Sequence, residues 1–238
     1  MIHSFHLAEV PLRTGAAALL RPPTSEAAPG LGHMECLSLM RLGAPVVSPD
    51  RLQLTRLAVF AQWRDEEALI QFLERNALGR ALDDGWHVRL EFLRRWSTIA
   101  AFPALPFRAG EWSQDDPVVA VTLARMKLPQ LPRFLRHGRP VERLVRDHPG
   151  VSLAVAAFRP PRTVSTFSIW NSVRDMVGMV HGRSDVDQPA RHSAAMRERE
   201  RRDFHREFAT YRFRALSEYG TWQGRSHIVP VPPTASSD

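Results

Sequence analysis

The side chains best suited to chemistry in this 238-residue sequence are its ten histidines, which are spread along the whole chain. They form no HExxH or HxH pattern, and the single cysteine, Cys36, gives them no pair of thiolate partners, so a zinc hydrolase is not supported. The sequence contains no GxSxG nucleophile elbow, and Lys127, the only lysine, follows no glycine-rich phosphate loop. Serine hydrolases of that kind and P-loop enzymes are therefore not supported either.

His192 is the histidine whose neighbours leave most room for a flat ligand. The small residues Ser193, Ala194 and Ala195 follow it directly. One axial histidine from a helix, with an open apolar side opposite, is a common way to hold haem iron for oxygen chemistry. The same pattern fits a solvated histidine on an arginine-rich helix. Nearby arginines such as Arg197 fit either a solvated face or carboxylate partners such as haem propionates.

Two copies of one pattern of strands and helices make up the chain. In each copy an apolar strand ends in a tryptophan, at 55–63 and 164–170, and is followed by a capped helix and an alternating strand. Earlier segments add two strands and a helix, which gives the ferredoxin-like order β-α-β-β-α-β twice. We therefore predict an α+β protein with two fused ferredoxin-like repeats, packed face to face as a dimeric-α/β-barrel-like unit. Two independent domains are the alternative.

The predicted boundaries follow from loops and from one insertion. Proline-rich loops separate an N-terminal half, 1–110, from a C-terminal half, 111–227, and the tail 228–238 is expected to be flexible. Only the second copy has an extra segment before its last strand, and we predict a helix there over 190–209. An element present in one of two repeats is a natural place for function, and this helix carries His192.

Composition narrows the choice of partner and compartment. The chain has 32 basic and 25 acidic residues and is 44% hydrophobic, which indicates a folded protein with a basic surface. No predicted strand carries the aromatic string of an RNA-recognition motif, so no nucleic-acid partner is expected. With one cysteine, no signal-peptide pattern and no run of about 18 apolar residues, the chain is expected to be cytoplasmic.

Three stretches resemble the C-terminal half of the spheroidene monooxygenase family: FSIWNSVRDMVGMVHG, RHSAAMRERERRDFHREFATYRF and EYGTWQGR. The first half is similar to that family mainly through FAQWRDEEALIQF. The family-like positions in the C-terminal half are Trp170, Met176, His192, Ala195, Phe204, Glu207, Arg212, Phe213, Gly220, Trp222 and Gly224.

The resemblance implies a haem-dependent monooxygenase that oxidises an acyclic carotenoid or a similar apolar polyene with O₂ and an external electron donor such as ferredoxin. It implies His192 as the metal ligand, because this histidine lies in the matching motif, and Trp170 and Trp222 as further cofactor-binding residues. Arg197, on the same predicted helix, is a further cofactor-binding candidate as a partner for haem propionates. His181 and His205 are the alternative iron ligands. It assigns no catalytic residue. A membrane-resident substrate also fits association of a basic protein with the inner membrane surface. A cofactor-free barrel monooxygenase or isomerase and a non-enzymatic binding module are the alternatives.

Overall fold

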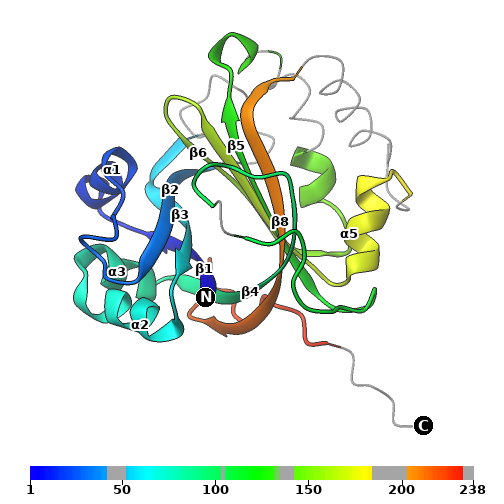
Figure 1. Ribbon diagram of the computed structural model, residues 1–238, viewed down its shortest axis with the longest axis horizontal. Coiled ribbons are helices and arrows are strands. Elements are labelled where there is room, and N and C mark those ends of the chain that lie inside the picture. The colour runs from blue at the N-terminus through cyan, green and yellow to red at the C-terminus, as the bar shows by residue number, and fades with distance from the viewer. Residues whose placement is uncertain (42–51, 103–104, 132, 134–141, 184–202, 233–238) are drawn as a thin grey trace.

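Eight strands form one closed barrel in the computed structural model, which describes residues 1–41, 52–102, 105–131, 133, 142–183 and 203–232. The strand order around the barrel is β1-β3-β2-β6-β7-β5-β8-β4. Every neighbouring pair in this order is antiparallel. Helices lie outside the barrel wall on two sides (Figure 1). The predicted dimeric-α/β-barrel-like fold is confirmed.

The element order repeats once along the chain, as predicted. The first repeat contains β1 (Ile2–Glu9), α1 (Leu12–Leu20), β2 (Leu31–Met40), β3 (Leu52–Trp63), α2 (Glu66–Arg75), α3 (Ala77–Asp83) and β4 (Trp86–Trp96). The second contains β5 (Val118–Met126), the short 3₁₀ turn η2 (Leu128–Gln130), β6 (Val151–Arg159), β7 (Thr163–Trp170), α5 (Val173–Val180) and β8 (His205–Tyr219). The division of the two halves near residue 110 stays a prediction.

The helices that follow the tryptophan-ended strands, α2 and α5, have polar side chains as N-caps. The Asp65 carboxylate accepts the Ala68 N–H at 2.9 Å, and the Ser172 hydroxyl accepts the Asp175 N–H at 3.0 Å. Each cap satisfies an N–H group that has no partner within its helix. Asn76 does the same for α3, a helix that the sequence pattern did not reveal, by accepting the Leu78 N–H at 2.9 Å.

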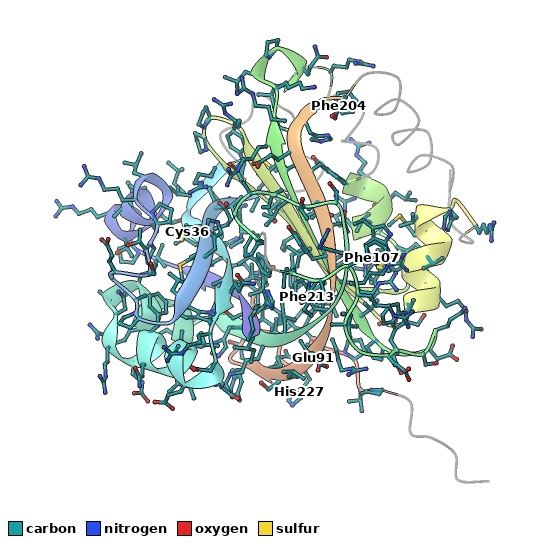
Figure 2. All side chains as sticks on the ribbon, in the orientation of Figure 1. Cys36, Glu91, Phe107, Phe204, Phe213 and His227 are labelled. Atoms are coloured by element: carbon teal, nitrogen blue, oxygen red, sulfur yellow. The ribbon has the colours of Figure 1, made fainter. Side chains whose placement is uncertain are left out.

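The barrel interior is filled by an apolar cluster to which all eight strands contribute. Successive side chains of a strand point to opposite faces, so every second residue faces inward. Phe5 and Phe167 stack there with ring centroids 3.6 Å apart, and Phe213 lies in the middle of the barrel in Figure 2. Full burial of one such side chain contributes about 1.5–3 kcal/mol. The main inward positions are Phe5, Leu7, Leu37, Leu39, Ala58, Phe60, Val88, Leu90, Val119, Val121, Leu123, Leu153, Ala157, Phe167, Ile169, Tyr211 and Phe213.

The outward-facing residues of the strands bury against helices. One outer cluster joins β1, β2 and β3 to α1, α2 and α3 and includes Cys36, Val59 and Leu69. A second joins β5 and β7 to α5 and includes Trp170 and Met176. Each strand in these regions is therefore apolar on both faces, which explains the nearly continuous apolar runs of the sequence.

The connection between β4 and β5 closes one opening of the barrel. Its residues Ile99, Phe102 and Leu105 are almost fully buried and belong to the interior cluster. In Figure 1 this connection, in green, passes across the barrel in front of the strands. The β4–β5 connection, which is not part of the barrel sheet, therefore fills part of the interior.

The structure corrects two predicted segments. The helix predicted over 190–209 is wrong for its last seven residues, because 203–204 are not helical and 205–209 belong to β8, which pairs with β5. Backbone pairing with the edge of β5 outweighs the helix preference of the charged residues in 205–209. The rest of that helix up to residue 202 lies outside the described residues. The predicted flexible tail is wrong at its start, where Ile228 is only 2% exposed.

Glu218 on β8 holds the beginning of the tail against the barrel. Its carboxylate accepts the Trp86 indole N–H at 2.7 Å and the backbone N–H groups of Ile228 and Val229 at 2.7 and 2.9 Å. Removing this carboxylate would leave all three N–H donors without their acceptor.

We expect Glu218→Ala to lower the free energy of unfolding by about 2–3 kcal/mol, because buried donors lose a charged acceptor. Urea unfolding followed by tryptophan fluorescence measures the change. Glu91→Ala is the matched control on β4, since Glu91 makes a half-exposed ion pair with Arg214 and should cost less than about 1 kcal/mol. Equal losses in the two variants would contradict the anchoring role of Glu218.

Candidate functional site

Polar side chains gather inside one opening of the barrel, called here the polar opening. The strand registers bring the starts of β1, β2, β7 and β8 together with the ends of β3, β4, β5 and β6 at this opening. The alternation that turns apolar residues inward along these strands also turns polar residues inward here. They are His3, His33, Glu35, Gln62, Arg125, Arg159 and Glu207.

Two histidines flank a glutamine across three neighbouring strands. Gln62 of β3 pairs in register with His3 of β1 on one side and with His33 of β2 on the other. Strands lie about 4.8 Å apart, so the two imidazoles start from backbones about 10 Å apart. The ring of Phe60 lies 5.9 Å from that of His3, and the ring of Phe102 lies edge-on 5.0 Å from that of His33. Aromatic rings therefore separate two imidazoles that share one rim.

His3 is held in its neutral form. It is 1% exposed, and burial, followed by the positive N-terminus, lowers its pKa to about 3. Its ring lies 5.0 Å from that of Phe213, and its Nδ1 has no hydrogen-bond partner among the described residues. The Gln62 amide N–H donates to His3 Nε2 at 3.4 Å, so the neutral ring carries its proton on Nδ1 and presents an N–H donor without a partner among the described residues.

Glu35 of β2 is a buried carboxylate with three cationic or donor partners. Its oxygens lie 2.9 Å from His33 Nε2, 3.2 Å from Arg125 Nη2 and 2.5 Å from Arg159 Nη2. Burial favours the neutral acid, but the hydrogen bond from His33 and the charges of Arg159 and Arg125 outweigh it, so the pKa of Glu35 lies below its usual value. The carboxylate is therefore ionised at neutral pH.

Glu207 of β8 extends the ionic contacts to the β4–β5 connection. One oxygen pairs with Arg125 Nη1 at 3.1 Å, and the other accepts the backbone N–H of Ala100 at 3.0 Å. Arg125 thus bridges Glu35 and Glu207. This bridge ties the connection that plugs the barrel to the charged rim of the polar opening.

The four predicted cofactor-binding residues are not brought together among the described residues. His192 and Arg197 lie outside the described residues. Trp170 is 1% exposed in the outer cluster beneath α5, and its indole N–H donates to the Ser168 hydroxyl at 2.8 Å. Trp222 belongs to the interior cluster, and the Arg56 guanidinium lies 5.9 Å from its ring. The two tryptophans thus lie on opposite sides of the barrel wall, and the role of all four residues stays a prediction.

Two other histidines considered beside His192 are described. His181 is the C-cap of α5, and His205 begins β8 with its Nδ1 3.1 Å from the Asp203 carboxylate. The ring of His205 packs against Phe204 and Phe208, which belong to an apolar cluster separate from the interior one.

The residues of the polar opening were missed in the sequence, although a signal for each exists. His3 alternates with Phe5 and Leu7, and Glu35 alternates with Leu37 and Leu39, so each lies on an apolar face. A polar residue in phase with such a face is a candidate for a buried functional group. The alternation does not tell which strand ends meet, because that depends on the order of strands around the barrel.

None of the described helices is long and apolar enough to cross a membrane. Within the described ranges, no three His, Cys, Asp or Glu side chains come together as a metal site. The polar opening therefore offers single imidazoles and an arginine-rich rim.

Comparison with known proteins confirms the resemblance drawn from the sequence. No protein-family model matches the chain. The chain is 29% identical over 180 residues to spheroidene monooxygenase of Rubrivivax gelatinosus, a match that covers 74% of this chain and 67% of that protein. This similarity supports the predicted class of enzyme, a monooxygenase.

Solved structures bear on the fold alone. An aldoxime dehydratase in complex with butyraldoxime is similar with a TM-score of 0.53 at 8% identity, over 91% of this chain and 79% of that chain. An anthrone oxidase-like protein is similar with a TM-score of 0.35 at 15% identity, over 91% of this chain and 92% of that chain. The first of these supports the barrel architecture.

Stability should fall as the pH is lowered, because buried histidines are kept neutral. Burial lowers the pKa of His3 to about 3 and that of His6 well below its ordinary value of 6.5. The unfolded chain therefore binds more protons than the folded chain below about pH 6.5, so each such histidine should cost about 1.2 kcal/mol between pH 7 and pH 5.5.

His3→Gln should reduce this loss by about 1 kcal/mol, as measured by urea unfolding at the two pH values. His227→Gln is the control, since this histidine is exposed and points away from the barrel in Figure 2. An unchanged pH dependence in His3→Gln would show that His3 is not held neutral by the fold.

Proposed function

We propose that this protein is a haem-dependent monooxygenase that oxidises an acyclic carotenoid, or a similar apolar polyene, with O₂. The similarity to spheroidene monooxygenase carries the proposal. One oxygen atom enters the substrate, and the other is reduced to water with two protons and two electrons from an external donor of the ferredoxin class. The aromatic interior of the barrel supports an apolar substrate, because it offers dispersion contacts and few polar partners.

The described residues fit a haem in two respects. The rim of the polar opening carries arginines of the kind that bind propionate carboxylates, and the apolar interior suits a flat macrocycle. We propose His192 as the iron ligand, with Arg197 and Trp222 as further contacts to the cofactor. Trp170 is buried on the outer side of the barrel wall, so it would not contact a haem held in the interior. Haem, when bound, supplies the reductive activation of O₂.

Room for a large flat ligand can come from the β4–β5 connection. Ile99, Phe102 and Leu105 fill the interior from a segment that is not part of the strand ladder. Their displacement opens the interior without breaking any hydrogen bond between barrel strands. Such a movement would break the bond from the Ala100 N–H to Glu207 and the bond from Arg95 Nε to the Leu105 carbonyl, at 3.0 and 2.7 Å.

Selectivity for substrate should then come from shape. The interior wall presents Phe5, Phe60, Phe167 and similar rings, and one methylene more or less in an apolar site changes binding by about 1–3 kcal/mol. Several elongated polyenes should therefore be accepted. A basic protein of this kind can reach a membrane-dissolved substrate by associating with an anionic membrane surface.

A cofactor-free monooxygenase is the second candidate. The neutral imidazole of His3, whose Nδ1 has no protein partner among the described residues, offers such a reaction a hydrogen-bond donor for a substrate oxygen. The two candidates differ in whether the protein binds haem.

Replacing the proposed ligand should abolish the haem spectrum. We expect His192→Ala to eliminate the Soret band of protein prepared with a haem supply and to leave its circular dichroism unchanged, because an axial nitrogen is lost while the barrel is kept. His181→Ala and His205→Ala, which remove the two nearest alternatives in sequence, should retain the band. Loss of the band in either of these or in His3→Ala, with His192→Ala unaffected, would overturn the ligand assignment.

Oxidation of linear carotenoids tests the proposed reaction. Expressed with a reductase in a host that makes acyclic carotenoids, the protein should add oxygen atoms to several of them, each detectable by mass, because the interior recognises shape. A haem-loaded, reducible protein that leaves every linear pigment unchanged would remove the carotenoid substrate. A colourless protein that still oxidises them would favour the cofactor-free candidate.

A further inference from the structure

An arginine-lined pocket lies beside the polar opening, on its outer rim. It has a volume of about 600 Å³ and lies between the end of α1, the ends of β5 and β6 and the starts of β7 and β8. These strand ends meet in the upper part of Figure 1. The pocket is lined by Leu19, Leu20, Arg125, Arg159, Pro160, Pro161, Arg162, Thr163, Arg206 and Glu207.

Positive charge dominates the lining of this pocket. Four guanidinium groups face one carboxylate, that of Glu207. Glu35, buried behind Arg125 and Arg159, supplies a second negative charge. Even with both carboxylates counted, the pocket keeps two positive charges in excess.

The two excess charges can be assigned to particular side chains. Arg125 is bridged between Glu35 and Glu207, and Arg159 is paired with Glu35. Arg162 and Arg206 have no carboxylate partner among the residues that the structure describes. Two guanidinium groups are thus available for an incoming anion, beside two that are already held in place.

The geometry of the lining favours an anion over solvent alone. A guanidinium group presents parallel N–H donors that match the spacing of carboxylate or phosphate oxygens. Arg125 and Arg159 are positioned by their ion pairs with Glu35, so they lose little freedom on binding. Leu19, Pro160 and Pro161 add an apolar wall next to the donors.

We propose that this pocket binds a doubly negative group, either two carboxylates of one ligand or a phosphate, through Arg162 and Arg206 with support from Arg159. The bound charge of two matches the excess charge of the pocket. Two sources of such a group are available: a free anion, and the paired propionates of a haem whose ring enters the adjoining barrel. The second source rests on the proposed function, and the first does not.

The free-anion arm uses inorganic phosphate as the probe. Thermal unfolding of the full chain is followed while phosphate is added at constant ionic strength, since a ligand that binds only the folded state raises Tm. The wild-type Tm should rise with phosphate. In Arg162→Gln/Arg206→Gln the apparent Kd should increase at least about tenfold, because two charge-assisted hydrogen-bonding groups are lost.

The control removes the same net charge elsewhere. Arg13→Gln/Arg75→Gln changes two exposed arginines on α1 and α2 that do not line the pocket, and it should keep the phosphate-dependent rise. A wild-type Tm that does not respond to phosphate, or an equal response in the pocket double variant, would overturn the proposed site.

The second arm identifies the source of the anion. Haem and its dimethyl ester, whose propionates are uncharged, are titrated separately while tryptophan fluorescence is measured. If propionates occupy the pocket, the wild type should bind the dimethyl ester about tenfold more weakly than haem. The Arg162→Gln/Arg206→Gln variant should bind the two ligands equally. Equal affinities for the two forms, with the phosphate response retained, assign the pocket to a free anion. Absence of any haem binding contradicts the proposed function and leaves the phosphate result standing.

Discussion

The carboxylate of Glu35 is the interaction on which both the barrel and its candidate site depend. The two repeats are joined at two seams, and the seam between β2 and β6 is short, since only Ser38–Met40 pair with Ala156–Phe158. Glu35 extends this seam beyond the backbone hydrogen bonds by binding Arg159 on β6 and Arg125 on β5. A buried charge without partners is costly, so this one group constrains how the ends of β5 and β6 lie against the start of β2. Removing Glu35 itself would leave Arg159 without its carboxylate partner and Arg125 with Glu207 alone.

The same constraint organises the chemistry of the polar opening. Arginines that neutralise Glu35 are fixed in place, so the rim carries preorganised positive charge beside an interior that is almost entirely apolar. His3 faces that interior as a neutral imidazole, because the apolar surroundings disfavour its protonated form. An apolar interior with an arginine-lined rim suits an amphipathic ligand better than a fully polar or a fully apolar one.

The closed barrel also explains why a plug is present. A sheet of eight strands encloses an interior that side chains must fill, and the strands alone are supplemented by Ile99, Phe102 and Leu105 of the β4–β5 connection. The bond between Ala100 and Glu207 links this plug to the ion pairs of the rim. Moving the plug would therefore disturb Glu207 and, through it, Arg125.

The sequence by itself determined the repeat, the strand and helix types, and the caps of Asp65 and Ser172, because these depend on local periodicity and on neighbouring residues. It also carried the resemblance to a monooxygenase, through motifs near the last strand. Only the tertiary structure decided that 205–209 continue β8, and that Trp170 and Trp222 lie on opposite sides of the barrel wall. It alone brought Glu35 to Arg125 and Arg159, residues far apart in the chain, because the order in which strands close a barrel sets which ends meet. Local patterns fix the direction of each side chain, whereas a site made of several strands depends on long-range pairing.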